Sequence, residues 1–355
     1  SMTAESTITN AGTQPNVINQ NTVAYSRDGK TTLPGYYTVK YEPGMLTVNK
    51  ITAKVTVTVT EKSGSATYDG EEHTVYGYET MTANNDFYDV KTSVEETKTD
   101  TWTAKGTNVG TYPVGIKASD FKNINKNFTN VEFVIVDGTL TITPISGEII
   151  ITAASESRPY DGTALTNAGF TYTGTLVDGD TLKAVVEGSA TNVGDEGTNV
   201  VKSYKVLRGT TDVTENYTFG ASVPGKLTIT PRTVTLTSET ASKPYDGTPL
   251  TRPNVTGGDG FVTGEVTDIK ATGSVTYVTE GEVENTITYK TGAKFNADNY
   301  TITEYPGKLS ITASEEEVTV TIAGGTDTTT YDGEKHSVDG YEIKGISNSL
   351  YKAED

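Results

Sequence analysis

The sequence predicts an all-β protein made of small tandem domains, and three observations support this class. Threonine is unusually abundant, at 67 of 355 residues, and 21 tyrosines accompany it; both residue types favour pleated strands. Short segments such as 54–60 alternate apolar residues with threonine, which is typical of a strand with one buried face. Two motifs also recur along the chain. We therefore expect small antiparallel β-sandwich or β-grasp-like domains, joined end to end into an elongated rod.

The two recurring motifs share one period. Tyr-Asp-Gly begins at Tyr68, Tyr160, Tyr245 and Tyr331, at spacings of 92, 85 and 86 residues. A glycine two residues before a leucine begins the second motif, at Gly44, Gly138, Gly225 and Gly307, with spacings of 94, 87 and 82 residues. This period exceeds the roughly 20–50 residues of a solenoid repeat and suits a string of small domains.

Each repeat has the same predicted elements in the same order. An alternating strand opens it, at 54–60, 148–152, 233–237 and 318–322. The Asp-Gly of the first motif then predicts a turn, because aspartate bonds to its own backbone and glycine accepts positive φ. Short strands and glycine-rich turns follow, with at most a helical turn near 119–127 or 212–216. The second motif is the closing strand, and Pro144 and Pro231 end it because proline lacks a backbone donor.

An asparagine–aromatic pair precedes each complete closing strand, at Asn127-Phe128, Asn216-Tyr217 and Asn299-Tyr300. The markers predict three complete repeats, 51–143, 144–230 and 231–312, with a closing half at 1–50 and an opening half at 313–355. Repeat 51–143 and the half 313–355 share Tyr-Asp-Gly-Glu-x-His, whereas the other two repeats have Tyr-Asp-Gly-Thr. Both histidines, His73 and His336, therefore occupy one repeated position, which favours a structural role over a catalytic one.

The two half-repeats leave three arrangements open. The folding unit could be permuted relative to the motifs, giving four domains. Each half could fold alone, although segments of this size rarely do so without disulfides or metals. Alternatively, the halves could pair head to tail between molecules, because unpaired strand edges bind other strands.

Charge and composition exclude several function classes. The net charge of −18 disfavours nucleic acid and anionic membranes, both of which require clustered Lys and Arg. The chain has no cysteine and two histidines, so thiol chemistry is excluded and a histidine-based metal or catalytic site is disfavoured. No apolar run reaches the roughly 18 residues of a membrane helix. We expect a protein that is not an enzyme and has no cofactor or resident metal.

Together these motifs resemble the YDG and MBG-type repeat domains of bacterial cell-surface adhesins, which are related to mucin-binding protein modules. The resemblance covers nearly the whole chain. It implies an extracellular stalk that projects a distal binding region from the bacterial surface and attaches to the cell wall through a region outside this sequence. The alternative it implies is direct binding of host glycans or mucin by the repeats themselves.

No residue pattern identifies a ligand site, and we assign no catalytic, cofactor or metal residues. Exposed tyrosines can stack on sugars, and two groups lie close in sequence: Tyr76, Tyr78 and Tyr88, and Tyr36, Tyr37 and Tyr41. Packing over a small core is the favoured role for most of them, including the tyrosine of Tyr-Asp-Gly. Trp102, the single tryptophan, is also expected to be packed.

Three further chemistries are weaker candidates. Glu95-Glu96 and 315–317 supply carboxylates, but no pair is marked for glycoside hydrolysis. Asp178, Asp180 and Asp259 lie in turns that could bind calcium, although plain hairpin turns are favoured. A lysine precedes each asparagine–aromatic pair, as an isopeptide bond would require; the pairs are Lys117–Asn127, Lys205–Asn216 and Lys290–Asn299. A surface lysine and a turn asparagine are the favoured alternative.

Overall fold

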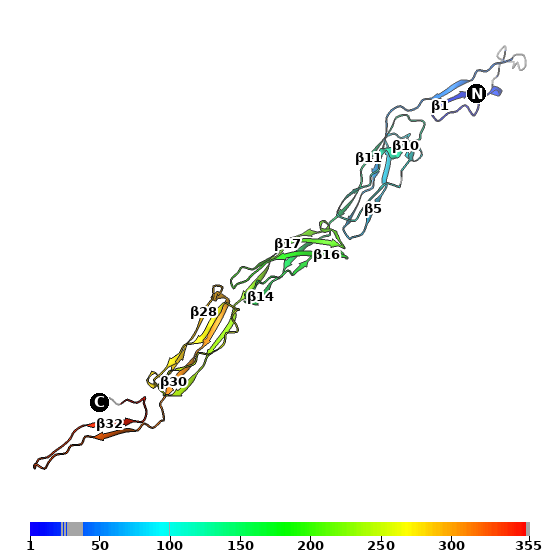
Figure 1. The fold of residues 1–355 in the computed structure, drawn as a ribbon. Helices are drawn as coiled ribbons and strands as arrows, with labels where there is room; N and C mark the ends of the chain where they lie inside the picture. Colours follow the sequence, from blue (N-terminus) through cyan, green and yellow to red (C-terminus); the bar gives the residue numbers. More distant parts are fainter. Residues whose placement is uncertain (23, 25, 27–37, 99, 353–355) are drawn as a thin grey trace. The chain divides into compact units, whose positions relative to one another are not determined.

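The computed structural model describes residues 1–22, 24, 26, 38–98 and 100–352, and confirms the all-β class (Figure 1). The chain divides into two compact units. One contains residues 1–151, 172–184 and 204–221, and the other contains 152–171, 185–203 and 222–355. The division falls inside the segment 144–230, and the five predicted domain boundaries stay predictions.

Segment 51–143 contains two three-stranded sheets. In one, β3 (Val55–Glu61) lies between β6 (Tyr78–Ala83), which is antiparallel, and β11 (Val131–Val136), which is parallel. In the other, β12 (Thr139–Thr143) pairs antiparallel with β9 (Gly110–Pro113) and parallel with β4 (Gly64–Thr67). The alternation predicted for the opening strand is confirmed, because the valines at 55, 57 and 59 are fully buried and the threonines between them are not.

Smaller pairs complete this segment: β5 (His73–Tyr76) with β8 (Thr103–Gly106), and β7 (Val94–Glu96) with β10 (Phe121–Asn123). A four-residue helix, α1 (Val90–Ser93), lies before β7, and the Asp89 side chain caps it. The sequence did not predict α1, because a single turn leaves no helical periodicity to detect.

The same parallel pairings recur further along the chain. The opening strands β13 (Glu148–Ala153) and β21 (Arg232–Ser238) pair parallel with β19 (Thr218–Phe219) and β29 (Tyr300–Tyr305). The closing strands β20 (Gly225–Thr230) and β30 (Gly307–Thr312) pair parallel with β14 (Glu156–Pro159) and β22 (Ala241–Pro244). The sheets are therefore mixed, not purely antiparallel, because the long middle of each repeat supplies the crossover that a parallel pair requires.

The other strands are two to eleven residues long, and the longest of them lies inside a sheet. They are β15 (Phe170–Thr173), β16 (Asp180–Glu187), β17 (Thr198–Arg208), β18 (Thr211–Asp212), β23 (Leu250–Thr251), β24 (Val255–Gly257), β25 (Val266–Ala271), β26 (Ser274–Val275), β27 (Val283–Asn285) and β28 (Ile287–Thr291). The 3-10 turns are η1 (Gln20–Thr22), η2 (Ala118–Asp120), η3 (Thr214–Asn216), η4 (Val278–Glu280) and η5 (Ala297–Asn299). Of these, η2 and η3 lie where the sequence predicts a short helical turn.

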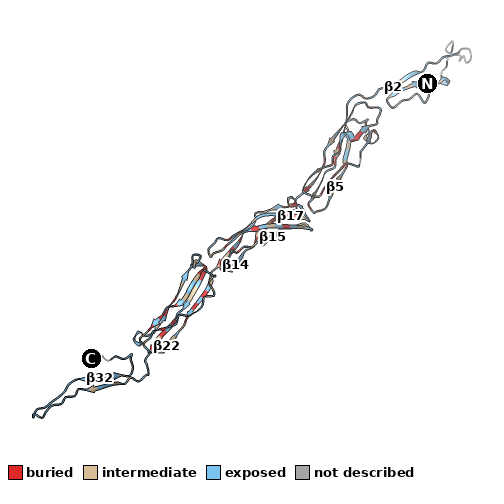
Figure 2. Ribbon diagram, in the orientation of Figure 1, coloured by how far each residue is buried: buried red, intermediate tan, exposed pale blue. Residues whose placement is uncertain are grey.

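Each end of the chain forms one antiparallel pair. At the start, β1 (Gly12–Asn16) pairs with β2 (Gly44–Val48), and at the other end β31 (Val320–Gly324) pairs with β32 (Tyr341–Ile346). No residue described in 1–50 or 313–352 is buried (Figure 2). Within the described residues, these pairs therefore build no core of their own.

Candidate functional site: the repeat junctions

The Tyr-Asp-Gly motif is a turn in all four copies, as predicted. In each, the aspartate Oδ1 accepts a hydrogen bond from the backbone N–H two residues later, at 2.8–3.0 Å. The glycine has φ between 78° and 85°, a left-handed conformation that side chains disfavour. The backbone of the turn therefore requires glycine. The tyrosine that begins the motif lies, in space, at the end of the repeat that faces the following segment.

At the first junction, between segments 51–143 and 144–230, that tyrosine binds a carboxylate of the following segment. Tyr68 Oη donates to Asp180 Oδ2 at 2.9 Å, and Tyr217 Oη donates to the same oxygen at 2.5 Å. The two rings pack edge to face, with centroids 5.7 Å apart. Tyr68 is 2% exposed and the Asp180 side chain is fully buried, so the hydrogen-bonded group is closed to water.

Arg208 balances the charge of this buried aspartate. Its Nε donates to Asp180 Oδ1 at 2.7 Å, and its Nη1 donates to the carbonyl oxygen of Gly70 at 3.3 Å. The guanidinium also lies 5.9 Å from the centre of the Tyr68 ring. Arg208 thus holds both the aspartate of its own segment and the turn of the preceding one.

The second junction, between segments 144–230 and 231–312, repeats this arrangement with glutamate. Tyr160 Oη donates to Glu265 Oε1 at 2.6 Å, and Tyr300 Oη donates to Oε2 at 2.7 Å. The rings again pack edge to face, 5.5 Å apart. All three residues are at most 7% exposed. We call the two groups, Tyr68–Asp180–Tyr217 and Tyr160–Glu265–Tyr300, the tyrosine–carboxylate clusters.

Burial raises the pKa of the cluster tyrosines, and the adjacent carboxylate adds to this effect. The pKa of Tyr160 and that of Tyr300 rise to about 12, with Glu265 as the carboxylate in both cases. The pKa of Tyr217 is raised too, first by burial and then by Asp180. All these phenols therefore remain protonated donors at physiological pH.

A second contact, the asparagine clamp, recurs at three junctions. Asn127, Asn216 and Asn299 each accept from one backbone N–H of the preceding segment, at 2.6–2.8 Å. The donors are Ala11, Val109 and Val193. Each clamp asparagine also donates from Nδ2 to the side-chain oxygen of a second asparagine, at 2.9–3.0 Å. These second asparagines are Asn10, Asn108 and Asn192.

Apolar packing also crosses the second junction. One buried cluster includes Leu227 and Ile229 from β20 together with Val234 and Leu236 from β21, and both tyrosines of the junction belong to it. The hydrogen-bonded groups therefore lie at the edge of a continuous hydrophobic core, which strengthens them by excluding water.

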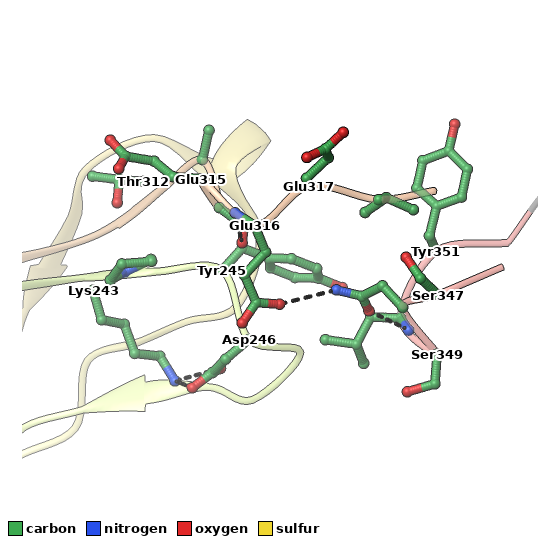
Figure 3. A pocket seen from close by; sticks show the side chains of 16 residues that line it. Lys243, Tyr245, Asp246, Thr312, Glu315, Glu316, Glu317, Ser347, Ser349 and Tyr351 are labelled. Carbon is green, nitrogen blue, oxygen red and sulfur yellow. Dashed lines mark hydrogen bonds and ion pairs between the residues drawn. The ribbon is translucent and has the colours of Figure 1, made fainter. Parts of the chain in front are cut away.

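The junction after segment 231–312 differs. Tyr277 stands where Asn108 and Asn192 stand earlier, and its ring stacks on Tyr245 at 6.3 Å. A pocket of about 1440 Å³ lies at this junction and is lined by the Tyr245-Asp246 turn and by residues 312–318 and 347–351 (Figure 3). Lys243 pairs with Asp246 at its edge, at 2.8 Å. Within the described residues, neither a tyrosine–carboxylate cluster nor an asparagine clamp closes this junction.

The tyrosines proposed for glycan binding divide by environment. Tyr88 is buried and donates to Asn123 Oδ1 at 2.8 Å, and Tyr78 donates to Glu96 at 2.6 Å, where burial and this glutamate raise its pKa to about 12. Tyr76 is 53% exposed. Tyr41 is described, whereas Tyr36 and Tyr37 lie outside the described residues.

Two expected packing roles are confirmed. Trp102 is 2% exposed, stacks on Phe121 and donates to Asp120 at 3.1 Å. The tyrosines of the first two Tyr-Asp-Gly turns are buried as well. Tyr160 packs in a buried cluster with Leu227 and Ile229 of its own segment, and the following segment completes its burial through Tyr300. Tyr331 is correspondingly 94% exposed.

The remaining candidates have structural explanations. Each histidine pairs with the aspartate of its turn: His73 Nε2 lies 3.0 Å from Asp69, and His336 Nε2 lies 2.7 Å from Asp332. Asp180 is occupied by the first cluster instead of facing a cation, and Asp259 is exposed. Among the described residues, no group of three potential ligands could hold a metal ion.

The lysines paired with clamp asparagines do not meet the requirements for isopeptide chemistry. Lys117 is exposed, and Lys205 and Lys290 form surface ion pairs with Asp212 and Asp268. That reaction needs a lysine desolvated in a core. The three asparagines instead use their amides to bind the preceding segment.

The sequence analysis did not identify the junction carboxylates. A signal existed, because Asp180 precedes Tyr217 by 37 residues and Glu265 precedes Tyr300 by 35. The aromatic residue at the same place in segment 51–143 is Phe128, which has no hydroxyl to donate. It packs instead against Tyr88 of its own segment.

Comparison with known proteins identifies one part of the chain. The family model named MBG domain matches residues 54–144. A crystal structure of the I9–I11 tandem from titin is 11% identical, with 75% of this chain and 99% of that chain covered and a TM-score of 0.15. No curated protein matches the chain. No described helix is long and apolar enough to cross a membrane. Residues 54–144 thus match the MBG domain model, and the two segments that follow repeat their motifs and their parallel strand pairings.

Proposed function

We propose that this chain is a spacer region of a bacterial surface adhesin, extracellular and attached to the cell through another part of the protein. Its repeats would hold a distal binding region away from the surface. One observation carries the proposal: two successive junctions are closed by the same buried tyrosine–carboxylate cluster together with an asparagine clamp. Such junctions limit bending between repeats. As a spacer, the chain catalyses no reaction.

Two further features support this role. The closing strand β20 ends at Thr230, and the next opening strand begins at Arg232, so one residue joins them. A linker this short leaves little freedom of orientation. The net charge of −18 also keeps neighbouring repeats and neighbouring molecules from collapsing onto each other.

The stiffness of the second junction can be measured by pulsed electron paramagnetic resonance. The chain lacks cysteine, so Lys202→Cys and Lys294→Cys, both at exposed positions, place spin labels on its two sides. We expect a narrow distance distribution that broadens when Tyr160→Phe and Asn299→Ala are added. Tyr305→Phe, at a residue 58% exposed, serves as the control. A broad distribution before any junction substitution would contradict the spacer proposal.

Direct glycan binding is the second candidate, and one pocket favours it. The pocket, about 540 Å³, lies in the MBG domain and joins apolar surface to polar groups that can bind hydroxyls; its lining residues are Tyr78, Met81, Val90, Lys91, Val94 and Glu96. A glycan panel and mucin would test it, with Lys91→Ala as the pocket variant and Lys122→Ala as the control. Saturable binding lost only in Lys91→Ala would support this site, and absence of binding would reject it.

A further inference from the structure

Segment 51–143 has one sheet edge with little protection against a further strand. β11 is an outer strand of the sheet β11–β3–β6, and among the described residues it pairs with β3 alone. Its six residues, Val-Glu-Phe-Val-Ile-Val, favour strands apart from Glu132, and they contain no proline and no register shift. Regular edges of this kind bind other strands unless a charge, a proline or a bulge blocks them.

The backbone of β11 has alternate residues that face outward. The Val55 N–H binds the Asn130 carbonyl at 2.9 Å, so the even-numbered residues of this strand direct their N–H and C=O groups toward β3. The odd-numbered ones, Phe133 and Ile135 among them, direct theirs away from the sheet. No described strand or loop bonds to these outward groups. The edge therefore offers donors and acceptors at the spacing of a β-ladder.

The side chains of the even-numbered residues lie on the exposed face of the sheet, beside this edge. Val134 is 39% exposed and Val136 is 46% exposed. Threonines of β3 lie directly across the ladder from both. Glu132, the one charge on the strand, forms an ion pair with Lys54. An apolar strip thus borders one end of the edge, and the charge lies at the other end.

The two other complete repeats block the equivalent edge. Ile135 lies three residues before Gly138 of the closing strand, and Glu304 lies three residues before Gly307. β29 therefore carries an exposed charge where β11 has isoleucine. In segment 144–230 the equivalent strand, β19, has only two residues. An edge charge and a very short edge strand are both devices by which proteins prevent edge pairing.

β6, the opposite edge of the same sheet, is blocked as well. Its register with β3 shifts where Thr60 faces Thr80 and Glu61 faces Tyr78, which leaves Glu79 without an opposite residue. Glu79 is also exposed. A bulge of this kind twists an edge away from an incoming strand. β11 therefore differs from all three of these edges.

Charge decides how a second copy of β11 can pair with this edge. In a parallel, in-register pair, Glu132 would lie opposite Glu132, and like charges directly opposite each other are destabilising. In an antiparallel pair centred on Ile135, Glu132 lies opposite Gly138 instead, which has no side chain. Val134 then lies opposite Val136, in a non-hydrogen-bonded pair, where side chains are closest. The antiparallel register thus covers both exposed valines and separates the charges.

We propose that β11 of one molecule pairs antiparallel with β11 of a second copy of this chain, centred on Ile135, and joins the two sheets into one. The same surface serves both molecules, so the contact is a closed two-fold dimer and does not extend into chains. It goes beyond the proposed spacer role, because the paired segments run in opposite directions and so suit molecules on two facing surfaces. Both partners carry a net charge of −18, so the association strengthens as salt increases.

Sedimentation velocity of the full chain, from micromolar to near-millimolar concentration, tests this contact. We expect a monomer–dimer equilibrium with no larger species. Val134→Lys and Val136→Glu should each weaken the dimer about tenfold or more, because the new charge would be desolvated against an apolar side chain. Tyr305→Glu, at the 58% exposed residue of β29 equivalent to Val136, is the matched control and should leave the dimer unchanged. A monomer at all concentrations, or a dimer insensitive to both valine variants, would overturn the proposal.

Mixing the two valine variants tests the register. The lysine introduced by Val134→Lys lies opposite the glutamate introduced by Val136→Glu only in the proposed antiparallel pair, so the mixture should associate more tightly than either variant alone. A mixture of Val134→Lys with Val134→Glu should gain less. A larger gain in this second mixture, or no gain in either, would refute the register. Junction stiffness is a separate measurement within one molecule, so the spacer role and the dimer can each fail alone.

Discussion

At the residue scale, the junctions depend on a buried carboxylate with two phenol donors. Asp180 and Glu265 differ by one methylene, and each cluster compensates for this difference. The shorter Asp180 binds both phenols through one oxygen and uses the other for Arg208, whereas Glu265 gives each phenol its own oxygen. Since a buried charge is stable only when its lone pairs are satisfied, the donors are as necessary as the acid.

Tyr160→Phe should therefore destabilise the second junction. The substitution leaves Glu265 Oε1 buried without its phenol donor, and we expect a loss of about 1.5–3 kcal/mol, the range for hydrogen bonds to charged groups. Hydrogen exchange of β20 and β21 would measure the loss as a lower free energy of local opening. Tyr245→Phe is the matched control, because Tyr245 occupies the equivalent turn position but stacks on Tyr277. Equal effects of the two substitutions would show that the carboxylate contact is not responsible.

At the element scale, the closing strand begins with glycine because the opening half lies against it. Gly138, Gly225 and Gly307 each have a backbone oxygen where a Cβ would stand, and none of them has positive φ, so the requirement for glycine is spatial and not conformational. The nearest atoms are the carbonyl oxygens of Lys62, Ala154 and Glu239, each of which directly follows an opening strand. A backbone oxygen cannot move aside as a flexible side chain can, so this contact fixes how the two sheets of a repeat meet.

Gly307→Ala should destabilise segment 231–312. The new methyl would lie 2.2 Å from the Glu239 carbonyl oxygen, and overpacking of this kind costs about 1–3 kcal/mol or more. Gly44→Ala, at the equivalent position, where no described backbone atom lies within 4 Å of an added Cβ, should be neutral or slightly stabilising in the monomer. Urea denaturation of both variants at low protein concentration would compare them. Full tolerance of alanine at 307 would show that this close approach does not constrain the strand.

At the scale of the whole molecule, hydrophobic burial is confined to residues 51–312 among those described. The chain's cohesion therefore depends on several small cores and on the contacts between them. The tyrosine–carboxylate clusters lie at those contacts. The stability of neighbouring segments therefore depends on whether the phenols of the cluster tyrosines are protonated.

Stability should consequently fall in alkaline solution. The pKa of Tyr160 and that of Tyr300 are about 12 in the folded chain against an ordinary value of 10.0. Because the folded pKa is raised, the contribution is complete below pH 10 and is lost as the pH rises to about 12. Denaturation midpoints across this range should decline, and Tyr160→Phe should decline less steeply than the unmodified chain. Parallel declines would exclude Tyr160 as a source of the effect.

The sequence was sufficient to predict much of the local structure. Alternating threonine and valine predicted β3, and Asp-Gly predicted the turns at Asp69 and Asp161, because strand periodicity and glycine backbone freedom are properties of adjacent residues. Pro144 and Pro231 directly follow the strands they were predicted to end. These features depend on a few neighbouring positions, so a single chain reveals them.

The tertiary structure alone determined which distant residues meet. Tyr68 and Asp180 are 112 residues apart, and Asn216 and Asn108 are 108 apart, so no local pattern joins them. The sequence identified the clamp asparagines as turn residues and the turn tyrosines as anchors of their own core. The structure assigns the asparagines to the junctions, and it adds to the core packing of Tyr160 a hydrogen bond to Glu265 of the following segment, because that segment completes the burial of a tyrosine at the end of a small core. The sequence by itself thus determined the repeat, its strands and its turns, whereas packing between segments decided which side chains join them.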